Sequence, residues 1–81
     1  FLAPELMNGG SPSKSSDVWS LGMILYHLFI SKATPSFIDL YEGSVSYKLK
    51  DKRMSNLISK MLSFDPKLRP SLEEVIEALK Q

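Results

Sequence analysis

Residues 17–30 read DVWSLGMILYHLFI, and this stretch decides the fold. Ten of its 14 residues are apolar, and on a helix they leave no polar face. A helix that is apolar on every side is normally buried on every side. A membrane-spanning helix needs about 20 apolar residues, whereas this run is shorter and contains His27. The stretch therefore predicts a buried central helix over residues 17–30.

The residues before this stretch carry helix-start signals. Ser15 and Ser16 are candidate N-caps, because a serine hydroxyl accepts a bond from an unpaired first-turn N–H group. Asp17 in the first turn suits the positive end of the helix dipole. Further upstream, Pro4 to Met7 predict one helical turn that stops before Gly9-Gly10.

Two further helices are predicted after the central one. The helix over residues 55–63 ends at Asp65-Pro66, because a residue before proline is pushed out of the helical region. Its apolar stripe has helical spacing and comprises Met54, Leu57, Ile58, Met61 and Leu62. The helix over residues 72–80 begins with Ser71 and Glu74 at capping-box spacing. Its apolar face comprises Leu72, Val75, Ile76 and Leu79.

Residues 31–52 give a weaker pattern with two alternatives. The apolar residues from Phe37 to Tyr41 allow a short helix, whereas Val45, Tyr47 and Leu49 alternate as in a strand. Lys48 to Arg53 is mostly charged and predicts a solvated loop.

The composition limits the class of protein. Eighty-one residues allow one small domain, and 43% apolar with 23% charged residues is ordinary for a globular chain. The net charge of +1 argues against a nucleic-acid-binding or polybasic membrane surface, so we expect neither partner. The absence of cysteine excludes disulfides and thiolate metal sites.

Three motifs occur in a fixed order along the chain. They are Ala3-Pro4-Glu5, residues 16–22 (SDVWSLG) and residues 62–71 (LSFDPKLRPS). Together they resemble the end of the activation segment, the central helix and the approach to the last helix of eukaryotic protein kinases. The resemblance covers nearly the whole chain. It implies a mainly α fold, in which residues 1–81 are a partial kinase domain: the C-terminal part of the large lobe, without the small lobe and the catalytic loop.

The resemblance gives roles to four structural residues. Glu5 resembles the acid that pairs with a buried arginine, here Arg69, and a guanidinium suits a carboxylate because it offers two parallel donors. Without the resemblance, Glu5 would be expected to cap its own turn and Arg69 to be a solvated loop residue. Asp17 resembles the aspartate that accepts backbone N–H bonds from the catalytic loop; alternatively it is a simple first-turn charge. Trp19 resembles the tryptophan that packs under the Ala-Pro-Glu turn.

Other positions concern the substrate. Phe1 and Leu2 match the end of the loop that receives the substrate, and they are more similar to serine/threonine than to tyrosine kinases. Ile24 and Leu28 match positions that support the apolar columns beneath the active site, although ordinary core residues would look the same. His27 stands where kinases that prefer basic substrates often carry an acid; a satisfied core histidine is the alternative.

The resemblance also implies what lies elsewhere. The Gly-rich loop, the strand lysine, the His-Arg-Asp loop and the Asp-Phe-Gly metal ligand precede Ala-Pro-Glu in the family. We therefore expect no catalytic, cofactor-binding or metal-binding residue in this chain, which alone should be inactive and bind neither ATP nor Mg²⁺. Both would be bound by a longer parent kinase, whose partners are the missing N-terminal part and protein substrates. No signal peptide is visible, but an internal fragment would not show one, so the sequence does not give the localisation. A pseudokinase scaffold and a stand-alone helical interaction module are the alternatives.

Overall fold

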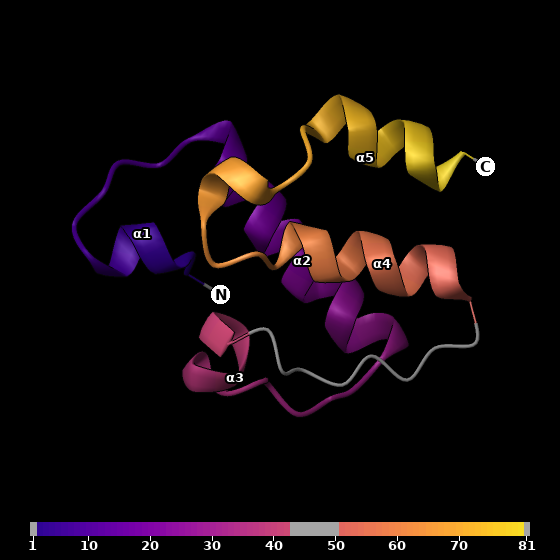
Figure 1. The fold of residues 1–81 in the computed structure, drawn as a ribbon, viewed down its shortest axis with the longest axis horizontal. Helices are drawn as coiled ribbons and strands as arrows, with labels where there is room; N and C mark the ends of the chain where they lie inside the picture. The colour runs from indigo at the N-terminus through magenta and orange to yellow at the C-terminus, as the bar shows by residue number, and fades with distance from the viewer. Residues whose placement is uncertain (1, 43–50, 81) are drawn as a thin grey trace.

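The computed structural model describes residues 2–42 and 51–80, and every regular element in these ranges is helical (Figure 1). The mainly α fold predicted from the sequence is therefore confirmed. In chain order the elements are α1 (Pro4–Met7), α2 (Lys14–Phe29), α3 (Phe37–Glu42), α4 (Lys52–Met61), the 3₁₀ turn η1 (Pro66–Leu68) and α5 (Leu72–Leu79). None of the helices in these described ranges is both long and apolar enough to cross a membrane.

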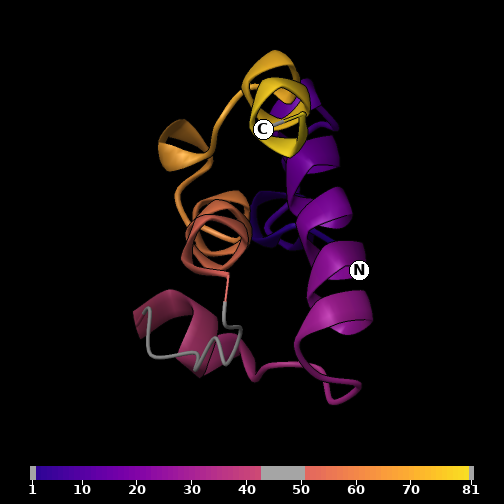
Figure 2. The ribbon, with the colours of Figure 1, turned by 90° about the vertical axis from the view of Figure 1, so that its right-hand side faces the viewer.

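The central element is α2, and α4 and α5 pack across it (Figure 2). In Figure 2, α2 runs down one side of the molecule while α5, α4 and α3 follow one another along its length. The α2 helix contacts α4, α5 and η1 directly. Two apolar clusters fill the space between these elements. One contains Ala3, Trp19, Met23, Tyr26, Leu40, Ile58 and Leu62, and the other contains Val18, Met61 and Val75.

The close contact between α2 and α4 depends on Gly22. A Cβ atom at this position would lie 2.8 Å from the Cβ of Met61 and 3.2 Å from the Cδ2 of Leu62. The first of these distances is shorter than any ordinary carbon–carbon contact. The absence of a side chain at Gly22 therefore sets how closely the two helices approach.

The α2 helix begins earlier than predicted. Its N-cap is Ser13, whose Oγ accepts a hydrogen bond from the N–H of Ser16 at 3.2 Å. The Oγ of Ser16 in turn accepts one from the N–H of Ser13 at 2.8 Å. These reciprocal bonds satisfy two unpaired donors at once, as in a capping box. The predicted caps, Ser15 and Ser16, instead lie inside the first turn.

The prediction that this helix is buried on every side is wrong for the described residues. Val18, Trp19, Met23 and Tyr26 are buried, but Ile24, Leu28 and Phe29 are 48%, 70% and 51% exposed. One face of the central helix thus has no cover from the rest of residues 2–42 and 51–80.

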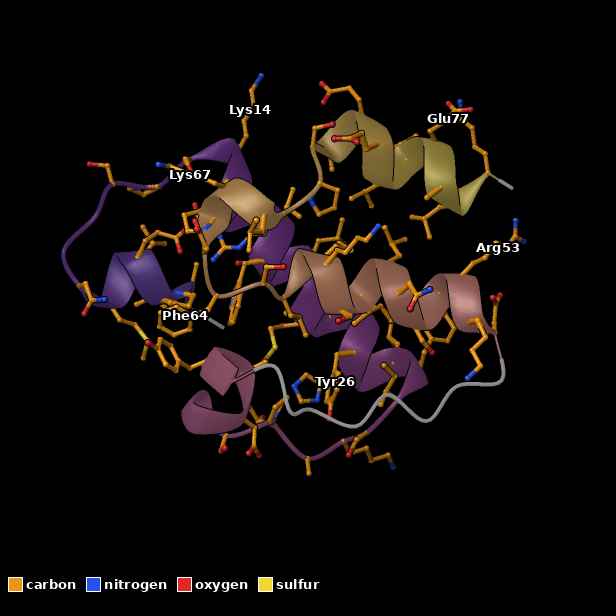
Figure 3. The ribbon with its side chains drawn as sticks, in the orientation of Figure 1. Lys14, Tyr26, Arg53, Phe64, Lys67 and Glu77 are labelled. Atoms are coloured by element: carbon orange, nitrogen blue, oxygen red, sulfur yellow. The ribbon has the colours of Figure 1, made fainter. Side chains whose placement is uncertain are left out.

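The α4 helix also begins earlier than predicted, because Asp51 caps it. The Oδ1 of Asp51 accepts hydrogen bonds from the N–H groups of Arg53 at 3.0 Å and Met54 at 3.3 Å. Lys52 and Arg53 are helical and exposed (Arg53 is labelled in Figure 3), so the loop predicted over residues 48–53 is wrong for these two. The helix ends at Met61, two residues before the predicted end.

The remaining predictions have different outcomes. The turn at α1 and the short helix α3 are both present. The alternating residues 45, 47 and 49 lie outside the described residues. The predicted capping box of α5 is confirmed: Ser71 Oγ accepts from the N–H of Glu74 at 3.1 Å, and Glu74 Oε1 accepts from the N–H of Ser71 at 3.0 Å.

Candidate functional site

The candidate site is centred on the side chain of Arg69, directly after η1. Pro66 begins this turn, and the Oδ1 of Asp65 caps it by accepting from the N–H of Lys67 at 2.9 Å. The backbone N–H of Arg69 donates to the carbonyl of Pro66 at 3.3 Å, which closes the turn. Arg69 then has an extended backbone, and its side chain is fully buried. A buried guanidinium needs acceptors for all of its donors.

Five hydrogen bonds meet this requirement. The Nη1 and Nη2 atoms of Arg69 donate to Oε2 and Oε1 of Glu5 at 2.8 and 2.9 Å, which makes a bidentate ion pair. The Nε atom donates to the carbonyl of Ser63 at 2.9 Å, Nη1 also to that of Ser15 at 3.0 Å, and Nη2 to that of Phe64 at 3.3 Å. A guanidinium has five N–H groups, so every donor of Arg69 has an acceptor.

Glu5 reaches Arg69 from the short helix α1. Its side chain is 22% exposed, so water still reaches the carboxylate. The hydrogen bonds from the guanidinium lower the pKa of Glu5, while partial burial opposes this shift. The carbonyl of Glu5 also accepts from the N–H of Gly10 at 2.8 Å, and Gly9 has a φ of +88° that suits glycine. The turn that carries the carboxylate is thus fixed at both ends.

Trp19 lies beneath this ion pair. The guanidinium carbon of Arg69 is 5.0 Å from the centroid of the indole ring, within the range of a cation–π contact. Trp19 and Ala3 are buried in the same core cluster. The start of α1, the first half of α2 and the segment after α4 therefore meet at one point.

Asp17, Leu2 and His27 take no part in the hydrogen bonds of Arg69. Asp17 is exposed in the first turn of α2, and within residues 2–42 and 51–80 its carboxylate forms no hydrogen bond or ion pair. Leu2 is exposed, and Phe1 lies outside the described residues. His27 is half-buried, and its Nδ1 lies 3.1 Å from the carbonyl oxygen of Ser31.

Sequence reasoning missed three members of the site. The carbonyls of Ser15, Ser63 and Phe64 accept bonds from Arg69, and the hydroxyl of Ser15 donates to the carbonyl of Pro66 at 2.9 Å. A backbone carbonyl is present at every residue, so the sequence contains no signal for the carbonyl contacts.

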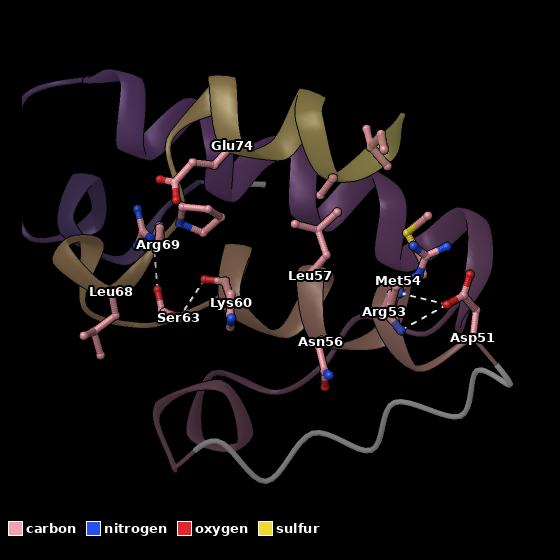
Figure 4. Close-up of a pocket in the computed structure, with 13 residues that line it drawn as sticks. Asp51, Arg53, Met54, Asn56, Leu57, Lys60, Ser63, Leu68, Arg69 and Glu74 are labelled. Carbon is pink, nitrogen blue, oxygen red and sulfur yellow. Dashed lines mark hydrogen bonds between the residues drawn. The ribbon is translucent and has the colours of Figure 1, made fainter. Parts of the chain in front are cut away.

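A groove of about 750 Å³ lies between α4 and α5, with Arg69 at one end (Figure 4). Its walls combine apolar residues such as Leu57 and Leu79 with charged residues such as Lys60 and Glu74. In the part of the chain that the structure describes, no group of three His, Asp or Glu residues could hold a metal ion.

Comparison with known proteins identifies the family. Residues 1–79 match the protein kinase domain family. The chain is 33% identical over 88 residues to the probable serine/threonine-protein kinase CCRP1 of Zea mays, which takes in 95% of this chain and 14% of that protein. It is 37% identical over 89 residues to the probable serine/threonine-protein kinase nek3 of Dictyostelium discoideum, and this alignment covers 95% of this chain and 8% of that protein. The chain belongs to the protein kinase domain family.

A third relative has a different stated specificity. The membrane-associated tyrosine- and threonine-specific cdc2-inhibitory kinase wee-1.3 of Caenorhabditis elegans is 32% identical over 84 residues, with 95% of this chain and 12% of that protein covered. The chain spans less than a fifth of the length of each of these three relatives. All three alignments are longer than the chain itself, so each relative has residues in this interval that the chain lacks.

Proposed function

We propose that the chain is the C-terminal segment of the large lobe of a protein kinase that transfers the γ-phosphate of ATP to serine or threonine in proteins. The longer protein is called the parent kinase below. The observation that carries the proposal is the bidentate pair between Glu5 and the fully buried Arg69. It joins two of the three family motifs, 64 residues apart, and it occurs within a match to the kinase family over residues 1–79.

In this proposal the segment organises the substrate loop without making or breaking a bond. The ion pair and Trp19 fix the turn at Glu5, and Phe1 and Leu2 directly precede this turn in the chain. Positioning of this kind is a main source of phosphoryl-transfer catalysis, because the reacting groups need little covalent help. Leu2 is exposed and is therefore accessible to a protein substrate.

Asp17 is proposed to support the catalytic loop of the parent kinase. Its carboxylate is exposed and has no partner among residues 2–42 and 51–80, so it is available to N–H donors from outside them. Ile24, Leu28 and Phe29 expose apolar side chains on the same helix, which is an argument that another segment of the parent kinase covers this face of α2. Such a patch is unusual on the surface of a complete domain. In this proposal ATP and Mg²⁺ bind to the rest of the parent kinase, outside these 81 residues.

The test is a phosphotransfer assay on the parent kinase with ATP, Mg²⁺ and matched serine, threonine and tyrosine peptides. We expect labelled phosphoserine or phosphothreonine, and no transfer by the 81-residue chain alone. The isolated chain should also show no shift in melting temperature with ATP and Mg²⁺. A parent kinase without transfer would contradict the proposed activity, and transfer to tyrosine alone would contradict the proposed specificity.

A further inference from the structure

Ser15 connects the first turn of α2 to η1 through two hydrogen bonds. Its hydroxyl donates to the carbonyl of Pro66 at 2.9 Å, and its own carbonyl accepts from Nη1 of Arg69 at 3.0 Å. Pro66 is the first residue of the 3₁₀ turn, and Arg69 directly follows its last residue. The two bonds therefore hold both ends of this turn against the start of α2.

The local structure explains why Ser15 can reach both partners. Ser13 caps the helix, which places Ser15 in the first turn of α2 with helical backbone angles. Ser15 is half-buried, so its hydroxyl is partly withdrawn from water. Pro66 has no N–H of its own, and its carbonyl already accepts from Arg69 N at a long 3.3 Å. The hydroxyl of Ser15 supplies the shorter of the two bonds to this oxygen.

We propose that Ser15 is a positioning residue that sets the orientation of the Arg69 guanidinium, and through it that of Glu5 and the α1 turn. The inference rests on the proposed function, in which this turn organises the substrate loop. The guanidinium is planar and rigid, so a fixed Nη1 bond to Ser15 also fixes the plane in which Nη1 and Nη2 meet Glu5. A shift of η1 away from α2 would rotate that plane.

Ser63 offers a matched control in the same region. Its hydroxyl donates to the carbonyl of Lys60 at 2.7 Å, within three residues of the same chain segment. Its contact with Arg69 uses the backbone carbonyl, which an alanine would keep (Figure 4). Ser63→Ala thus removes one serine hydroxyl beside Arg69 without breaking a bond between α2 and η1. Ser15→Thr keeps a hydroxyl at the position under test and should restore the wild-type behaviour.

The first measurement is amide hydrogen exchange in the parent kinase. The N–H groups of Leu6 and Met7 donate to the carbonyl of Ala3 at 3.0 and 3.3 Å, and they report on α1. We expect Ser15→Ala to speed their exchange about three- to tenfold, the usual scale for losing one hydrogen bond. Ser63→Ala and Ser15→Thr should leave it unchanged. Equal exchange in Ser15→Ala and Ser63→Ala would overturn the inference, and this readout does not depend on catalytic activity.

The second measurement separates binding of the two substrates. In Ser15→Ala we expect kcat/KM for the peptide to fall about three- to tenfold while KM for ATP stays unchanged. An equal loss in Ser63→Ala, or an equal change in KM for ATP, would show a general loss of stability and overturn the positioning role. A wild-type parent kinase without activity would contradict the proposed function alone, because the exchange comparison would still decide the role of Ser15.

Discussion

Removal of either member of the Glu5–Arg69 pair should destabilise the large lobe of the parent kinase strongly. Glu5→Ala removes two of the five hydrogen bonds of a side chain that is fully buried. The three carbonyl acceptors and the Trp19 ring remain, so the stranded cation is only partly compensated. Breaking a buried ion pair costs about 3–5 kcal/mol, and we expect about 3 kcal/mol for this variant.

Arg69→Ala should cost more. It removes all five hydrogen bonds and the packing against Trp19, whereas the carboxylate of Glu5 is 22% exposed and can be rehydrated. We expect about 5 kcal/mol, the upper end of the range for a broken buried pair. Once Arg69 is absent, Glu5 has lost its partner, so the double variant should also lose only about 5 kcal/mol. The coupling energy is then about 3 kcal/mol.

Equilibrium unfolding in urea measures these free energies, with the slope of each curve compared between variants to detect changes in the unfolded state. Arg53→Ala is the control, because Arg53 is exposed on α4 and lies outside this hydrogen-bond network. Its free energy of unfolding should fall much less than that of Arg69→Ala. If the losses of the two single variants add up to the loss of the double variant within about 0.5 kcal/mol, Glu5 and Arg69 act independently and the reasoning is refuted.

The pH dependence of stability provides a second check on this pair. The guanidinium lowers the pKa of Glu5 below its usual value of 4.5, so the folded state favours the ionised carboxylate. The stabilisation is therefore fully present above pH 4.5 and is lost as the pH falls through the lowered pKa of the folded state. Glu5→Gln has no such titration. The free-energy difference between wild type and Glu5→Gln should shrink on acidification below pH 4.5, and a constant difference would contradict the assignment.

Two further predictions test the rest of the site. Asp17→Asn in the parent kinase should lower kcat about tenfold with little change in ATP affinity or melting temperature. The reason is that it weakens charge-assisted bonds to the catalytic loop and keeps the shape of the side chain. An unchanged kcat would show that Asp17 is only a charge at the helix end. Gly22→Ala would place a Cβ 2.8 Å from Met61, so overpacking of about 1–3 kcal/mol should outweigh a helix-propensity gain of about 1 kcal/mol. A raised urea midpoint would show instead that the two helices separate easily.

The helices could be predicted from the sequence because their signals are local. The capping box of α5 joins Ser71 and Glu74, only three residues apart, and it forms as predicted. The errors at the starts of α2 and α4 are also local in origin. Serines stand at positions 11, 13, 15 and 16, and only the backbone conformation of Ser13 selects it as the cap. At α4 the charges of Lys52 and Arg53 led to the prediction of a solvated loop, whereas Asp51 caps a helix that begins at Lys52.

The motifs also predicted the partnership of Glu5 with Arg69, through the family resemblance rather than through any periodicity. The pair is present in the structure. Its consequence for catalysis stays a prediction, as do the roles of Asp17, Trp19 and Leu2. The rest of the site depends on the fold, because the carbonyls of Ser15, Ser63 and Phe64 look like any others in the sequence.

By itself, the sequence determined which segments are helical and which family the chain resembles, since capping, proline breaks and apolar periodicity act over a few residues. Only the tertiary structure decided which apolar residues are covered and how the buried cation is satisfied. Ile24 and Leu28 have the same apolar character as buried Met23, yet they are exposed because no described segment packs on their side of α2. Two of the acceptors of Arg69 are 64 and 54 residues away in the sequence, and only packing brings such distant groups within hydrogen-bond distance.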